Sequence, residues 1–109
     1  QFQRMSEIEE TLNRIKTHKS VRGIVVCNAD GKIVRNTFAE GKKEEGENIA
    51  KTIPPLAIKA RSAIRELDKT NELTFLRLRS KNYEIMVAPD KEFMLIVVQD
   101  TKGDKKEEA

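Results

Sequence analysis

Two residues could act together as a nucleophile and its base: Cys27, the only cysteine, and His18, the only histidine. Thiol chemistry requires the thiolate form, which a nearby base or cation favours. Cys27, however, ends an apolar run typical of a buried strand, where a small apolar filler is its commoner role. A structural zinc site needs four such ligands, and this chain offers two. We therefore expect a non-enzyme with no catalytic residue, no cofactor and no metal. A thiol-dependent activity at Cys27 is the enzyme-class alternative.

The spacing of Gly41 and Gly46 resembles that of the two glycines in a phosphate-binding loop. Such a loop continues with Lys and then Ser or Thr, but Glu47 and Asn48 stand at those places. A carboxylate there would repel a phosphate group. The segment from Ala39 to Glu47 is therefore predicted to be an exposed, charged loop, and nucleotide binding is not expected.

Composition and charge narrow the partner classes. Of the 109 residues, 36% are charged and the formal net charge is only +3, so no strongly basic surface for nucleic acid is predicted. Arg77 and Arg79 alone hint at such a surface, and a solvated strand face explains this pair more simply. The longest apolar runs are much shorter than the roughly 20 residues that cross a bilayer, so membrane insertion is not expected. A single cysteine and the lack of a secretory signal pattern predict a reducing, cytosolic location.

The chain is predicted to hold one domain, over residues 5–99. Met5 is interpreted as a natural start, which makes residues 1–4 an extension or a remnant of cloning, and residues 100–109 are expected to form a flexible charged tail. Ser6 and Glu9 have the spacing of a capping box, which predicts a helix starting there. Its apolar stripe consists of Met5, Ile8, Leu12 and Ile15.

A β-hairpin and a second helix are predicted next. Val21–Cys27 is rich in β-branched residues, Asp30 and Gly31 suit a tight turn, and Lys32–Phe38 returns as a second strand. After the loop, apolar residues recur at helical spacing: Ile49, Ile53, Ala57, Ala60, Ile64 and Leu67. Pro54 and Pro55 interrupt this pattern, and an interior proline costs a helix about 3 kcal/mol. We therefore expect the helix to start near Pro54 or to be kinked there.

Three more strands form a meander: Leu73–Ser80, Tyr83–Ala88 and Phe93–Gln99. The first and fifth strands are apolar at successive positions, so both of their faces must be covered. They belong in the middle of the sheet, while the more polar second and third strands belong at its edges. The prediction is an α+β fold: a mostly antiparallel five-stranded sheet in the order 2-1-5-4-3, with a helix on each face.

The third strand is predicted to join two copies of the chain. An exposed edge strand is a template for pairing, and monomeric proteins usually block it with proline, a bulge or an inward charge. The run Leu73–Leu78 contains neither proline nor glycine. Pairing of two such edges predicts a dimer with a continuous sheet. An edge covered by the neighbouring loop is the alternative.

Several blocks of the sequence resemble the roadblock dynein light chains. The most specific are Asn71–Lys81 and Glu84–Lys91, because hydrophobic patterning does not dictate their polar residues. Ile58–Ser62, Glu9–Leu12 and Val21–Val26 also match. The Pro54–Pro55 pair, the loop between Gly41 and Gly46, and the longer tail depart from the family pattern.

The resemblance implies a roadblock/profilin-like α/β/α sandwich that forms two-fold dimers through the third strand. It implies a non-catalytic light chain of cytoplasmic, flagellar or ciliary dynein. This adaptor would act in microtubule-based transport and bind a helical segment of the dynein intermediate chain in a groove between symmetry-related helices. The sequence does not decide whether the dimer is a homodimer or a heterodimer with a paralogue. The same fold also serves as a scaffold or regulator of small GTPases, which is the alternative function.

The expected interface residues fall into two groups. The partner-binding residues are Ile8, Leu12 and Ile15 of the first helix. The dimer interface is expected to comprise strand and helix residues: Leu73, Thr74, Phe75, Leu76, Arg77, Leu78, Arg79, Ile58, Arg61, Ser62 and Arg65.

Overall fold

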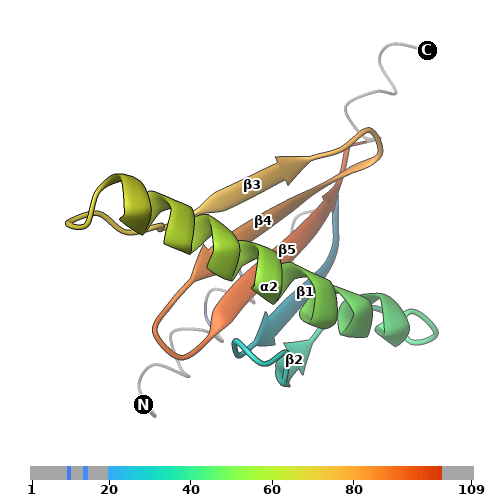
Figure 1. Ribbon diagram of the computed structural model, residues 1–109. Coiled ribbons are helices and arrows are strands. Elements are labelled where there is room, and N and C mark those ends of the chain that lie inside the picture. Colours follow the sequence, from blue (N-terminus) through green and yellow to red (C-terminus); the bar gives the residue numbers. More distant parts are fainter. Residues whose placement is uncertain (1–9, 11–13, 15–19, 102–109) are drawn as a thin grey trace.

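The computed structural model describes Glu10, Arg14 and residues 20–101. Its one long helix lies diagonally across a twisted sheet (Figure 1). The elements, in chain order, are β1 (Val21–Cys27), β2 (Ile33–Asn36), α2 (Lys43–Leu67), β3 (Leu76–Arg79), β4 (Tyr83–Pro89) and β5 (Met94–Asp100). No helix in this part of the chain is long and apolar enough to cross a membrane.

The predicted sheet order is confirmed. The five strands lie in the order β2-β1-β5-β4-β3, and each neighbouring pair is antiparallel. The two apolar strands therefore occupy central positions: β1 pairs with both β2 and β5, and β5 also pairs with β4. Buried residues in β1 and β5 form most of the core, as the successive apolar positions predicted.

The core is divided between the two faces of the sheet. One face of the sheet packs against α2, where the strand residues Val25, Cys27 and Ile96 meet the helix residues Ala50, Ile53 and Ala57. The other face holds a second buried cluster, made of Ile24, Val26 and Val97. The predicted first helix falls almost entirely outside the described residues. Within it, only Glu10 and Arg14 are described, and both are helical and exposed.

Phe38 connects the hairpin to the core beneath α2. Its ring is 2% exposed and lies over Gly23 of β1. A Cβ atom built on Gly23 would lie 2.4 Å from the ring carbons of Phe38. Only glycine therefore lets the aromatic ring approach the strand this closely.

The predicted loop over Ala39–Glu47 is wrong in its second half, because α2 already begins at Lys43. Asn36 of β2 holds this first turn: its side-chain amide donates to the Lys43 carbonyl at 3.2 Å, and the Lys43 ammonium donates to the Asn36 carbonyl at 2.7 Å. Gly46 is buried against the same side chain. Glu44 and Glu45 sit at the positive end of the helix dipole, where carboxylates are stabilising.

The prediction that the helix starts or is interrupted at Pro54 is also wrong, whereas the kink expected as the alternative stays a prediction. α2 runs through both prolines as one helix of 25 residues. Neither proline can donate to the carbonyl four residues back, so the Ala50 and Lys51 carbonyls lose their helical donors. Packing outweighs this loss, because Ile53, Pro54 and Ala57 are buried against the sheet. The turn at Gly31, with φ of +87°, passes directly over the Ala50 carbonyl oxygen, 2.7 Å from where a Cβ would lie.

We predict that Gly23→Ala lowers the free energy of unfolding by about 1–3 kcal/mol, the usual cost of overpacking a core. The added methyl group would collide with the Phe38 ring. Urea denaturation followed by circular dichroism measures the loss. In a Phe38→Leu background the same substitution should cost less, because the smaller side chain leaves room. An equal cost in both backgrounds would show that contact with the ring is not the cause.

Candidate dimer and partner-binding surfaces

The edge strand β3 is the first candidate interaction surface. It pairs with β4 on one side, from Leu76 opposite Val87 to Arg79 opposite Glu84. In the described part of the chain, no strand pairs with its other side. The observed strand is shorter than the predicted Leu73–Ser80, since pairing with β4 extends only as far as Leu76. Pro89, which would lie opposite Thr74, has no N–H to donate, and this explains the early end.

The side chains of β3 alternate between the two faces of the sheet. Leu76 and Leu78 turn toward the core beneath α2, where they are half-buried. Arg77 and Arg79 lie on the opposite face, each beside its cross-strand partner on β4, Met86 and Glu84 respectively.

Glu84 is a buried carboxylate held by both arginines. The residue is 4% exposed, whereas the side chains of Arg77 and Arg79 are 60% and 57% exposed. Arg77 donates through Nε to Glu84 Oε2, and an Arg79 guanidinium nitrogen lies 3.5 Å from Oε1. A carboxylate removed from water is costly unless it is paired and hydrogen-bonded. The two arginines thus stabilise the protomer itself, whatever they contact beyond it.

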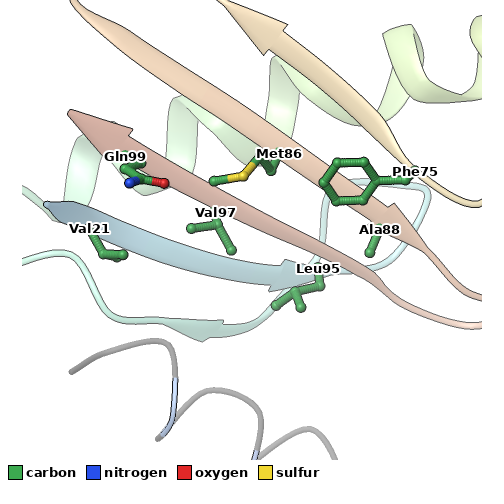
Figure 2. Close-up of a pocket in the computed structure, with 7 residues that line it drawn as sticks. All are labelled: Val21, Phe75, Met86, Ala88, Leu95, Val97 and Gln99. Atoms are coloured by element: carbon green, nitrogen blue, oxygen red, sulfur yellow. The ribbon is translucent and has the colours of Figure 1, made fainter. Parts of the chain in front are cut away.

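An apolar groove lies next to this charged cluster, on the sheet face opposite α2 (Figure 2). It has a volume of about 330 Å³ and crosses β5 and β4 toward β3. Phe75, which is 50% exposed, forms its wall near the β3 edge. The lining residues are Val21, Phe75, Met86, Ala88, Leu95, Val97 and Gln99.

The two flanks of α2 face different parts of the sheet. One flank, through Ile49 and Thr52, borders a hollow above Tyr83 and Ile85 of β4, on the side toward β3 (Figure 1). The opposite flank, through Ile58 and Arg61, borders the β4–β5 turn. Helical spacing of three and four residues continues the first flank along Leu56, Ala60, Ala63 and Leu67.

The predicted interface residues therefore separate into distinct places. The sheet edge holds the run Leu73–Arg79. A second surface, on the α2 flank that faces the β4–β5 turn, holds the other predicted residues: Ile58, Arg61, Ser62 and Arg65. Arg61 there lies 3.7 Å from the Glu72 carboxylate. The predicted partner-binding residues Ile8, Leu12 and Ile15 lie outside the described residues. Their assignment to an interface stays a prediction in every case.

Cys27, the candidate nucleophile, is fully buried in β1. Burial raises the pKa of its thiol, which disfavours the reactive thiolate. The candidate base His18 lies outside the described residues. Within residues 20–101, the environment of Cys27 is that of a core side chain and does not activate it.

A sequence model of the Roadblock/LC7 domain matches residues 7–100. The chain belongs to the Roadblock/LC7 domain family. The match covers nearly all of the residues on which the resemblance to roadblock proteins rested. It establishes the domain family without deciding between a dynein light chain and another Roadblock/LC7 protein.

Solved structures share the Roadblock/LC7 fold. The Roadblock/LC7 domain from Streptomyces avermitilis aligns with a TM-score of 0.69 at 13% identity, covering 78% of this chain and 70% of its own. Myxococcus xanthus MglB aligns with a TM-score of 0.61 at 11% identity, covering 75% of this chain and 66% of its own. A structure of MglB with a tetrameric arrangement aligns with a TM-score of 0.67 at 18% identity, covering 92% of this chain and 73% of its own. At such identities the similarity concerns the fold alone.

Sequence reasoning missed Glu84 and the apolar groove. The sequence favours a solvated strand face or a dimer seam for Arg77 and Arg79, but the structure shows that both arginines also pair with a buried carboxylate within the protomer. A signal was available, since a lone acidic residue at the start of β4 falls opposite Arg79 once the hairpin register is fixed. The groove could not be found this way, because its lining comes from β1, β4, β5 and the segment before β3.

We predict that Arg77→Gln with Arg79→Gln lowers the free energy of unfolding by about 1–2 kcal/mol, because Glu84 loses its partners. This is less than the usual loss for a buried pair, since both arginines are largely exposed. Adding Glu84→Gln should recover most of the loss. Urea denaturation of the double and triple variants measures it. A triple variant no more stable than the double would contradict the pairing.

Proposed function

We propose that this chain is a non-catalytic light chain of a dynein motor, working as a dimer that binds a helical segment of the dynein intermediate chain. The observation that carries the proposal is β3, a strand within the block Asn71–Lys81 whose outer edge pairs with no other strand of the described residues. That block resembles roadblock dynein light chains in polar residues that the fold alone does not require.

The dimer would form by antiparallel pairing of two β3 edges. Such pairing satisfies the outward backbone groups of both strands and closes the assembly around a two-fold axis. The five-stranded sheet would become continuous across two protomers. One solved structure of this fold has a tetrameric arrangement, which supports self-association as a property of related domains.

In this arrangement, we expect α2 to contact the partner through its flank on the β3 side. Leu56 is 43% exposed and Leu67 is 85% exposed on that flank, and Ala60 and Ala63 between them would let two helix backbones approach closely. The flank with Ile58, Arg61, Ser62 and Arg65 faces the β4–β5 turn instead. The proposal therefore favours the first flank over the residues predicted from sequence.

As an adaptor, the dimer would hold two intermediate-chain segments close together. Linking them raises the effective concentration of one for the other without any reaction. This role assigns the protein to microtubule-based motor complexes, in the cytoplasm or in an axoneme. The second candidate is a scaffold or regulator of small GTPases. The chain shares its fold with Roadblock/LC7 proteins from bacteria, and a shared fold does not by itself imply a dynein partner.

We predict that Ala63→Glu weakens the dimer at least about tenfold, whereas Ser62→Glu has little effect. Both residues are exposed in the protomer and adjacent on α2, but they point to different flanks. A carboxylate on the contacting flank would be buried unpaired, at a cost of more than about 1.4 kcal/mol. Sedimentation equilibrium measures the dissociation constant of each variant.

The reverse outcome, with Ser62→Glu alone dissociating the dimer, would assign the interface to the flank predicted from sequence. A wild-type chain that stays monomeric at high micromolar concentration, with no paralogue required, would overturn the dimer itself. Circular dichroism of both variants should match that of the wild type, because neither residue is part of the core.

We predict that the immobilised full chain retains purified dynein intermediate chain and that Ala63→Glu retains much less. Binding depends on the assembled dimer, so loss of the dimer should lower binding in proportion. The same column challenged with small GTPases tests the second candidate. Retention of a GTPase, without retention of the intermediate chain, would replace the dynein assignment by the scaffold function.

A further inference from the structure

We propose that two cations, Arg35 and Lys43, close the β2 edge of the sheet to strand pairing, so that assembly through β3 ends at two protomers. This inference rests on the proposed dimer, because it states why the second edge of the sheet takes no part in it. β2 and β3 lie at opposite edges (Figure 1), and the outer side of β2 pairs with no strand of the described residues. Ile33 and Val34 of β2 favour strands, so residue type alone does not prevent pairing there.

The hydrogen bonds between β1 and β2 show which backbone groups of β2 point outward. The Thr37 N–H donates to the Ile24 carbonyl oxygen at 2.9 Å, so the backbone groups of Thr37 face β1. Backbone groups alternate in direction along an antiparallel strand, and those of Arg35, two residues earlier, therefore face β1 as well. The carbonyl groups of its neighbours Val34 and Asn36 point away from the sheet.

Both of these outward carbonyl groups accept a hydrogen bond from a cationic side chain. An Arg35 guanidinium nitrogen donates to the Val34 carbonyl oxygen at 3.2 Å, and the Lys43 ammonium donates to the Asn36 carbonyl oxygen at 2.7 Å. Hydrogen bonds from charged donors are stronger than those from neutral ones. An incoming strand would have to displace these cations, or pass them, to reach the carbonyl groups.

The shape of β2 adds to this closure. The β1–β2 register shifts between Val26 and Cys27, which leaves one extra residue on β2 as a β-bulge. Bulges bend an edge strand and are one of the usual protections against pairing. At the other end of β2, the Asn36 side-chain amide donates to the Lys43 carbonyl, so α2 begins directly beside the edge. An incoming straight strand would meet the bulge at one end and the helix at the other.

Charge disfavours both seams that could contain β2. A second β2 would bring its own Arg35 and Lys43 to the seam, and like charges opposite each other destabilise a strand pair. Pairing of β2 with the β3 edge of another copy would place these cations against the exposed arginines of β3. At β3, by contrast, Arg77 and Arg79 reach inward to the Glu84 carboxylate on β4, which offsets part of their charge.

Closure of β2 decides the size of the assembly. A seam between two β3 strands joins two protomers about a two-fold axis and leaves a β2 edge at each end of the continuous sheet. If these ends could also pair, seams of the two kinds would alternate and generate an open chain of protomers. Closed β2 edges end the sheet after two copies.

The double variant Arg35→Met with Lys43→Met tests the closure in the full chain. Methionine keeps a long, unbranched side chain but has no N–H to donate, so both outward carbonyl groups lose their cations. Lys51→Met with Lys91→Met is the matched control, because it removes two positive charges from exposed sites outside β2 and β3. Sedimentation velocity at rising concentration measures the masses, and hydrogen exchange reports which strand gains protection.

We expect the wild type and the control to stay dimeric, whereas the double variant forms species of at least about twice the dimer mass, with added protection of β2. Arg35→Met alone, which keeps the Lys43 bond that holds the first turn of α2, should grow in the same way at about tenfold higher concentration. In the Ala63→Glu background, where the β3 seam is weakened, the opened β2 edges should join two protomers and no more.

A double variant that keeps the wild-type mass at every concentration would overturn the closure of β2. Equal growth of the control would trace association to lost charge and overturn it too, as would growth without protection of β2 or a wild type that already pairs through β2. A monomeric wild type with a double variant that dimerises through β2 would support the closure and reject the β3 dimer of the proposed function.

Discussion

The architecture depends on the burial of β1 and β5 on both of their faces. Ile24 and Val25 are successive residues of β1, they point to opposite faces, and both are 0% exposed. The same holds for the consecutive residues Ile96, Val97 and Val98 of β5, which are at most 7% exposed. Strands of this kind can only occupy the centre of a covered sheet. Their position forces β2 and β3 to its edges.

The candidate interaction surfaces follow from this division. α2 is fixed to the sheet as far as Ala57 by its buried residues, which are Gly46, Ala50, Ile53, Pro54 and Ala57. The helix beyond Ala57 extends past the core, as does the segment before β3. Of the exposed large apolar residues, Ile58, Leu67 and Phe75 belong to these two regions, and Leu56 lies on the outer side of α2 just before them. Leu56, Leu67 and Phe75 thus place apolar surface toward the β3 side of the protomer, where a second chain would cover it, whereas Ile58 borders the β4–β5 turn.

The sheet order and central strands could be predicted because they follow from local patterns: runs of apolar residues, turn residues and short connections. The start of α2 at Lys43 could not, since it depends on Asn36, a residue in another element that holds the first turn. Likewise, Pro54 stays helical only because its ring is buried against the sheet. The Glu84 cluster and the groove depend on cross-strand register. Each of these features is decided by tertiary contacts, which overrule local propensity.

The Pro54–Pro55 pair gives α2 two parts of unequal local stability. The pair removes two consecutive backbone hydrogen bonds in mid-helix, so unwinding of the C-terminal part need not disturb the bonds of the N-terminal part. From Ile58 to Leu67 no residue is buried. Opening of this stretch therefore exposes little new apolar surface, and its free energy lies well below that of global unfolding. Amide protons beyond the prolines should exchange with solvent rapidly in the isolated protomer and slowly once a second chain covers the helix. In the proposed dimer, the last turns of α2 would thus become ordered on assembly.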